Sequence, residues 1–342
     1  MSFSVLENNL NKQELLTLTE YFKNSNMFDE LLICITKFFE MSNNVLINVS
    51  YEEYYIFYNS ITYFINYKIN NIFNIEQLYK KEQILNKSLS GYLREIKINS
   101  IEELNKTLED LISLIKQKVI SNYIFDYKNY LISLSELTSV KNLVNNIDNK
   151  ENIDENLSNS KIYKNYYSKN IHIGKLFLLT NMILSECLYS IIITSKLNIL
   201  NNDENFSNNF NSLDDKHKEI AANELFDDIN VSNKKELNVY LENAILIANK
   251  ELENYNYLYL LCVLLKANYY SEILKDTKLA YNYLSNEYNL ISNLKYDDIT
   301  IDYSDKNKES NINYLIKKEE ELLLNNNVIN SIKKKIYYLE KL

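Results

Sequence analysis

Hydrophobic residues recur every three or four positions along most of this chain, which is the spacing of a helix with one buried face. Between residues 104 and 115, for example, Leu or Ile stands at positions 104, 108, 111, 112 and 115. The pattern predicts helices over residues 12–23, 27–41, 51–80, 82–120, 121–137, 171–200, 235–251, 255–274, 277–294 and 310–324. We expect the helix over 82–120 to be broken near Asn99. The prediction is an all-α fold, an antiparallel bundle of about nine helices joined by short turns.

Two polar stretches rich in Asn and Asp interrupt this pattern. They mark low-complexity insertions near residues 121–170 and 200–230, with the most loop-like parts at 140–159 and 201–215. Residues 325–342 are rich in Lys and are set apart as a C-terminal tail that continues as a loose helix. The sequence thus predicts one helical domain over residues 1–324, with two insertions, followed by the tail.

The composition favours helices over strands. The chain has 342 residues but no proline and only two glycines, whereas β-folds need turn residues that adopt positive φ. Asn takes over the turn positions, because it tolerates the left-handed conformation and caps helices.

Net charge argues against nucleic acid as a partner. The formal charge is −9, and of the 37 basic residues only Arg94 is an arginine. A protein that binds a phosphate backbone normally carries a basic patch and a high isoelectric point. We therefore expect no nucleic-acid partner.

Other features predict a cytoplasmic protein without catalytic chemistry. The N-terminus lacks the pattern of a signal peptide, and the one membrane-like stretch, 176–200, contains Asn181, Glu186 and Lys196, which favours a buried core helix over a membrane span. Cys34, Cys187 and Cys262 are predicted to be buried apolar side chains in a reducing compartment. The two histidines are isolated and no glycine-rich phosphate loop exists, so we expect no enzyme, no catalytic residue, no metal, no cofactor and no membrane partner.

The most distinctive segment reads N-Y-Y-S-E-I-L over 268–274, followed by a three-residue turn at 275–277 and by a second helix that contains A-Y-N-Y-L-S-N-E-Y-N-L-I-S-N-L over 280–294. This segment resembles the penultimate helix pair of the 14-3-3 proteins. The motifs K-Q-E-L at 12–15, M-F-D-E-L at 27–31 and I-E-Q at 75–77 resemble the family's other helices in the same order. The resemblance covers residues 12–120 and 235–324, and it implies a 14-3-3-like cup.

The middle of the chain leaves two places for the family's fifth helix. Residues 122–138 match its letters through D-Y-K-N-Y-L at 126–131, but they lie close to the fourth helix. Residues 171–200 fit the helix order better, and we slightly prefer them.

The resemblance implies a groove that binds phosphoserine or phosphothreonine peptides through one Lys, two Arg, a Tyr and backbone-gripping Asn residues. On the third helix, the family's Lys matches Thr62 (or Asn59), and its Arg matches Ile69 (or Asn66), with Lys68 adjacent. On the fifth helix, the Arg and the following Tyr match Leu188 and Tyr189 (or Asn129 and Tyr130). The Asn of the seventh helix matches Leu265, beside Leu264 in the apolar wall, Glu272 is retained, and Glu320 stands at the Asn of the ninth helix. No alignment of this chain supplies the two arginines of the clamp. Lysine cannot replace them, because it lacks the forked guanidinium group that forms paired hydrogen bonds with phosphate. The clamp is therefore degenerate; Lys68, Lys128 and Lys266 remain as a weaker anion site or as solvated surface.

The resemblance also implies a dimer through the first two helices. Leu15 and Phe28 stand on these helices, and Asp29 and Glu30 keep the family's acids, while Met27 replaces its arginine. A homodimer, a heterodimer with a fuller family member and a monomer are all allowed.

Together these features predict a non-enzymatic, 14-3-3-like adaptor in signal transduction that binds segments of other proteins in a concave groove, with little dependence on phosphate. One alternative is a structural or regulatory partner that dimerises with other 14-3-3 chains. Another is an unrelated α-helical repeat scaffold, although no regular repeat is visible.

Overall fold

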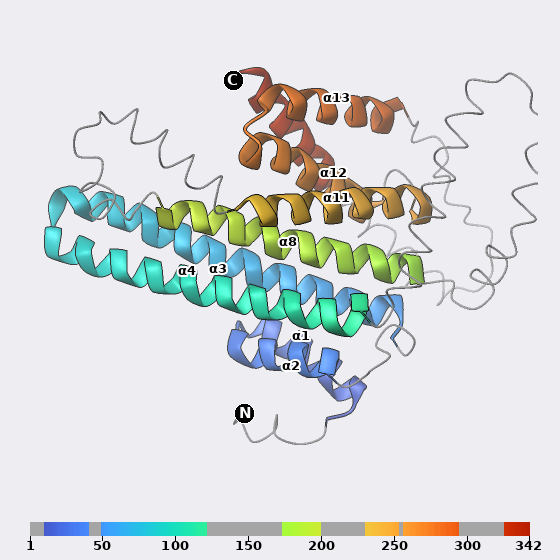
Figure 1. Ribbon diagram of the computed structural model, residues 1–342, viewed down its shortest axis with the longest axis horizontal. Helices are drawn as coiled ribbons and strands as arrows, with labels where there is room; N and C mark the ends of the chain where they lie inside the picture. Colours follow the sequence, from blue (N-terminus) through green and yellow to red (C-terminus); the bar gives the residue numbers. More distant parts are fainter. Residues whose placement is uncertain (1–9, 41–48, 122–172, 200–229, 253–255, 294–324) are drawn as a thin grey trace, which may run out of the picture. The chain divides into compact units, whose positions relative to one another are not determined.

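The computed structural model describes residues 10–40, 49–121, 173–199, 230–252, 256–293 and 325–342 (Figure 1). Within these ranges every regular element is a helix and no strand occurs, which confirms the all-α prediction. The chain divides by its internal contacts into two compact units, Met1–Tyr240 and Leu241–Leu342.

The first unit is built on two long helices. Its elements are α1 (Lys12–Asn24), α2 (Phe28–Glu40), α3 (Tyr51–Leu85), α4 (Lys87–Ile115) with a π-helical end at Lys116–Ser121, α8 (Ile173–Ile199) and the first part of α11 (Val231–Glu251). The predicted break near Asn99 is wrong: α4 runs through this residue, which is exposed. An exposed Asn costs a helix only about 0.7 kcal/mol, which the packing of the buried Ile101 and Leu104 nearby outweighs.

Helix α8 forms the centre of this unit and packs against α3 and α4. The stretch Gly174–Leu197 is long and apolar enough to cross a membrane, and 89% of its most apolar window is buried inside the protein. A helix that is hydrophobic on all sides needs protein around its whole circumference, so α8 behaves as the core helix that the sequence predicted.

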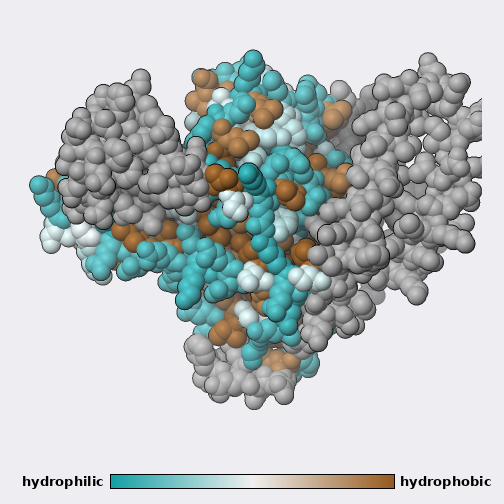
Figure 2. All heavy atoms as spheres, in the orientation of Figure 1, coloured by the Kyte–Doolittle hydropathy of each residue, from teal (hydrophilic) through white to brown (hydrophobic). Residues whose placement is uncertain are grey.

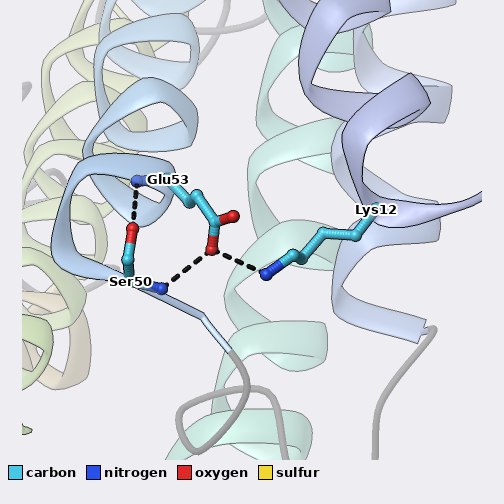
Figure 3. Close-up of polar contacts among 3 residues, drawn as sticks. All are labelled: Lys12, Ser50 and Glu53. Atoms are coloured by element: carbon cyan, nitrogen blue, oxygen red, sulfur yellow. Dashed lines mark hydrogen bonds and ion pairs between the residues drawn. The ribbon is translucent and has the colours of Figure 1, made fainter.

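The first turn of α3 is fixed by a capping box that also reaches α1. The Ser50 hydroxyl accepts from the Glu53 backbone N–H at 3.2 Å, and Glu53 Oε2 accepts from the Ser50 N–H at 2.8 Å (Figure 3). Lys12 Nζ, at the start of α1, donates to the same carboxylate oxygen at 2.9 Å. One glutamate therefore caps its own helix and holds the neighbouring one.

The second unit holds the rest of α11, then α12 (Tyr257–Asn268), a π-helical turn η3 (Tyr269–Ile273), α13 (Thr277–Asn293) and a helix over 325–340. Lys275 adopts a φ of 59° in the turn between η3 and α13. Residues 325–342, which the sequence pattern set apart as a tail, form a helix of this unit: Val328, Ile332 and Leu339 are buried, and Lys335 Nζ lies 2.6 Å from Glu272.

The three cysteines are buried, as predicted. The insertions over 122–170 and 200–229, and the predicted helices over 121–137 and 310–324 apart from Ser121, lie outside the described residues. Figure 2 shows hydrophilic residues over most of the described surface in its view, broken by hydrophobic patches.

Removing the capping hydroxyl should weaken the first unit. We expect Ser50→Ala to lower the free energy of unfolding by about 1 kcal/mol, because the Glu53 backbone N–H loses its acceptor. Urea unfolding followed by circular dichroism measures this change. The control is Ser88→Ala, in the exposed first turn of α4, and an equal loss in both variants would contradict the assigned role of Ser50.

Candidate functional site

A carboxylate lies between α3 and α8 in the first unit. Tyr58 OH donates to Glu186 Oε1 at 2.9 Å, and Thr62 Oγ1 donates to Glu186 Oε2 at 2.6 Å. Tyr58 and Thr62 are one turn apart on α3, so both hydroxyls lie on the face that meets α8. These three residues are named the Glu186 cluster below.

The cluster belongs to a line of polar contacts along α8. Towards the start of α8, Tyr54 OH and Thr180 Oγ1 are 3.0 Å apart. Towards its end, Thr194 Oγ1 donates to Asn105 Oδ1 of α4 at 2.6 Å. Buried polar groups need such partners, because water no longer reaches them.

Burial sets the electrostatics of the cluster. It raises the pKa of the Glu186 carboxyl, and the hydrogen bonds from Thr62 and Tyr58 oppose this rise. Both donors are neutral hydroxyls, so neither supplies a positive charge to the site. None of the three groups supplies the positive charge that holds a phosphate dianion, and the carboxyl repels an anion in its ionised form.

Two of the elements expected to form the groove do meet here. Thr62 contacts α8 two residues before Leu188, so α3 and the helix over 173–199 lie side by side. Leu188 itself is buried and Tyr189 is half-buried. The competing segment over 122–138 lies outside the described residues.

Two of the three lysines that the sequence predicted as a weaker anion site form ion pairs with glutamates. Lys68 Nζ donates to Glu103 of α4 at 3.1 Å. Lys266 is buried in the second unit, where its Nζ lies 3.2 Å from Glu242 and over the rings of Tyr269 and Tyr270. Lys128 lies outside the described residues.

The other expected groove positions belong to the second unit. Leu264 and Leu265 are half-buried on α12, and the Glu272 carboxylate in η3 accepts from Lys335 at 2.6 Å. Glu320 lies outside the described residues.

The expected dimer positions differ in their exposure. Leu15 is fully buried inside the chain, and the Phe28 ring, also buried, stacks on Tyr67 with centroids 4.3 Å apart. Asp29 is exposed and Glu30 half-buried. Of these four side chains, the exposed one is therefore Asp29.

Tyr58 and Glu186 were not among the site residues expected from the sequence. Glu186 had a signal: it is the single acidic residue of the 27-residue apolar helix α8, and an acid on a helix that is mostly buried needs hydrogen-bond donors. Tyr58 had no such signal, because it is one of 30 tyrosines in the chain and its local sequence does not set it apart.

No protein-family model matches the chain, and a search of curated proteins finds no significant match.

The raised pKa of Glu186 predicts how stability depends on pH. An acid with a higher pKa in the folded than in the unfolded chain binds its proton more tightly when folded, so stability is lost as the pH rises from its ordinary value of 4.5 through the raised pKa. Glu186→Gln removes this titration. We expect its stability relative to the native chain to be constant below pH 4.5 and to increase above it.

Urea unfolding at a series of pH values measures this difference. The control is Glu109→Gln, which removes an exposed acid of α4 in the same unit. A difference between Glu186→Gln and the native chain that does not change with pH would contradict the raised pKa.

Proposed function

We propose that the chain is a non-enzymatic helical adaptor, with a 14-3-3-like cup, that binds segments of other proteins without requiring phosphate. The observation that carries this proposal is the Glu186 cluster: at the position where the resemblance places a cationic phosphate clamp, Thr62 is hydrogen-bonded to a carboxylate. The all-helical architecture and the order of the motifs support the fold part of the proposal.

Electrostatics favours ligands without phosphate at this place. A phosphate dianion is held by guanidinium or ammonium groups, whereas the Glu186 cluster presents one carboxylate and two hydroxyls. Lys68, the cation that the sequence predicted on α3, is paired with Glu103. A peptide with a neutral or basic side chain avoids the repulsion that a phosphopeptide meets.

Peptide binding tests the proposal. Peptides selected from a random display library against the full chain are synthesised with and without phosphate on their Ser or Thr residues, and their affinities are measured by fluorescence polarisation. We expect the unphosphorylated form to bind at least as tightly as the phosphorylated one. Glu186→Gln should shift the ratio towards the phosphorylated form, because it removes the negative charge, while Glu109→Gln should not.

Two results would overturn the proposal. One is a phosphorylated peptide that binds the native chain more than about tenfold tighter than its unphosphorylated form, a difference of 1.4 kcal/mol. The other is a selection that yields no peptide binding to the full chain.

A further inference from the structure

The turn between α3 and α4 is made by a single residue, Asn86, which caps both helices. Its backbone N–H donates to the Glu82 carbonyl at 2.7 Å and closes α3. Its side-chain oxygen accepts from the Leu89 N–H at 3.2 Å, and its carbonyl accepts from the Ser90 N–H at 3.0 Å, so that α4 starts at once. Three hydrogen bonds to Asn86 thus join the two helices at the hairpin end, which is visible where the two longest ribbons meet in Figure 1.

Large apolar side chains are nevertheless exposed at this end. Ile84 is 88% exposed, Leu85 68%, Tyr92 61% and Leu89 41%. Because Asn86 closes both helices, this exposure belongs to well-formed helix and not to frayed ends. Residues 78–95 are named the hairpin tip below.

The stem of the hairpin holds the tip in place. Lys97 of α4 is fully buried and pairs with Glu76 of α3, which also lies 3.2 Å from Lys80. Ile72 and Ile101 are buried in the next layer. The apolar side chains of the tip therefore project from a fixed base.

The charge of the tip is opposite to that of the chain. Four basic residues and two acidic ones lie between positions 78 and 95, a net charge of +2 in a chain of −9. Lys80, Lys81 and Lys87 are exposed beside the apolar side chains. Exposed aliphatic side chains with lysines around them match the two layers of an anionic bilayer surface, acyl chains below and headgroup phosphates above.

We propose that the hairpin tip inserts shallowly into the surface of an anionic membrane. Ile84, Leu85 and Leu89 enter the boundary of the acyl chains, and the lysines reach the anionic headgroups with their extended stems. Tyr92 lies one turn further down α4, at the level where aromatic rings with a polar end are favoured. This contact is independent of the Glu186 cluster, and it departs from the expectation of no membrane partner, which rested on the absence of a spanning segment.

Vesicle sedimentation tests the proposal with the full chain. We expect binding to vesicles of phosphatidylcholine with phosphatidylserine, weaker binding to phosphatidylcholine alone, and a loss of affinity as salt is added. Ile84→Ser with Leu85→Ser should lower the affinity at least about tenfold. Replacing Lys80, Lys81 and Lys87 by Gln should remove the preference for phosphatidylserine.

Matched controls distinguish binding through the hairpin tip from non-specific binding of exposed apolar residues to vesicles. Val239→Ser and Leu290→Ser change residues that are 53% and 59% exposed elsewhere in the chain, and we expect both to bind vesicles as the native chain does. Circular dichroism checks that each variant is folded.

The proposal fails if the native chain does not sediment with phosphatidylserine vesicles, or if the serine variants at 84 and 85 bind as tightly as the native chain. It also fails if these variants abolish self-association seen in sedimentation velocity while vesicles are not bound, since the tip would then be a contact between copies of the chain.

Discussion

The burial of α8 against α3 and α4 is the constraint on which the first unit depends. This helix carries Thr180, Asn181, Ser185, Ser190 and Thr194 at buried positions in addition to its apolar residues. An unpaired polar group in such a place costs about 1–3 kcal/mol. Thr180, Asn181, Ser190 and Thr194 offset that cost by bonding to carbonyls one turn earlier in α8 itself. Tyr54 and Asn105 add contacts to Thr180 and Thr194 from α3 and α4, and these contacts require one register of α8.

The same constraint limits the chemistry of the candidate site. Glu186 accepts hydrogen bonds from two neutral hydroxyls, so the carboxylate is oriented without being neutralised. Burial raises the pKa of this carboxyl, and the two hydrogen bonds oppose the rise. A position that must stabilise α8 is poorly suited to gather the arginines of a phosphate clamp, and this chain has a single arginine from which to build one.

Several of the described lysines connect neighbouring helices. Lys12 joins α1 to α3, Lys68 and Lys97 join α3 to α4, and Lys335 joins the last helix to η3, each through a glutamate. A long, flexible stem allows lysine to reach a carboxylate on a neighbouring helix while its methylene groups pack. Against this background the exposed lysines of the hairpin tip stand apart, since they surround apolar side chains.

The amino-acid sequence by itself determined the helices, because a period of three or four residues is a local property. The ranges 12–23, 171–200 and 277–294 differ by at most two residues at either end from α1, α8 and α13. The turn between α3 and α4 was expected near residue 81 and lies at Asn86. The sequence did not locate it, because the chain has many Asn residues and the one that caps these helices has no distinct local pattern.

Only the tertiary structure decided which residues meet. Thr62 and Glu186 are 124 positions apart, and no local pattern links two such residues. The exposure of Ile84 and Leu85 was equally hidden, because an apolar residue near a helix end reads the same in sequence whether a neighbouring helix covers it or not. Contacts between distant segments depend on how helices pack, and packing is a property of the whole fold.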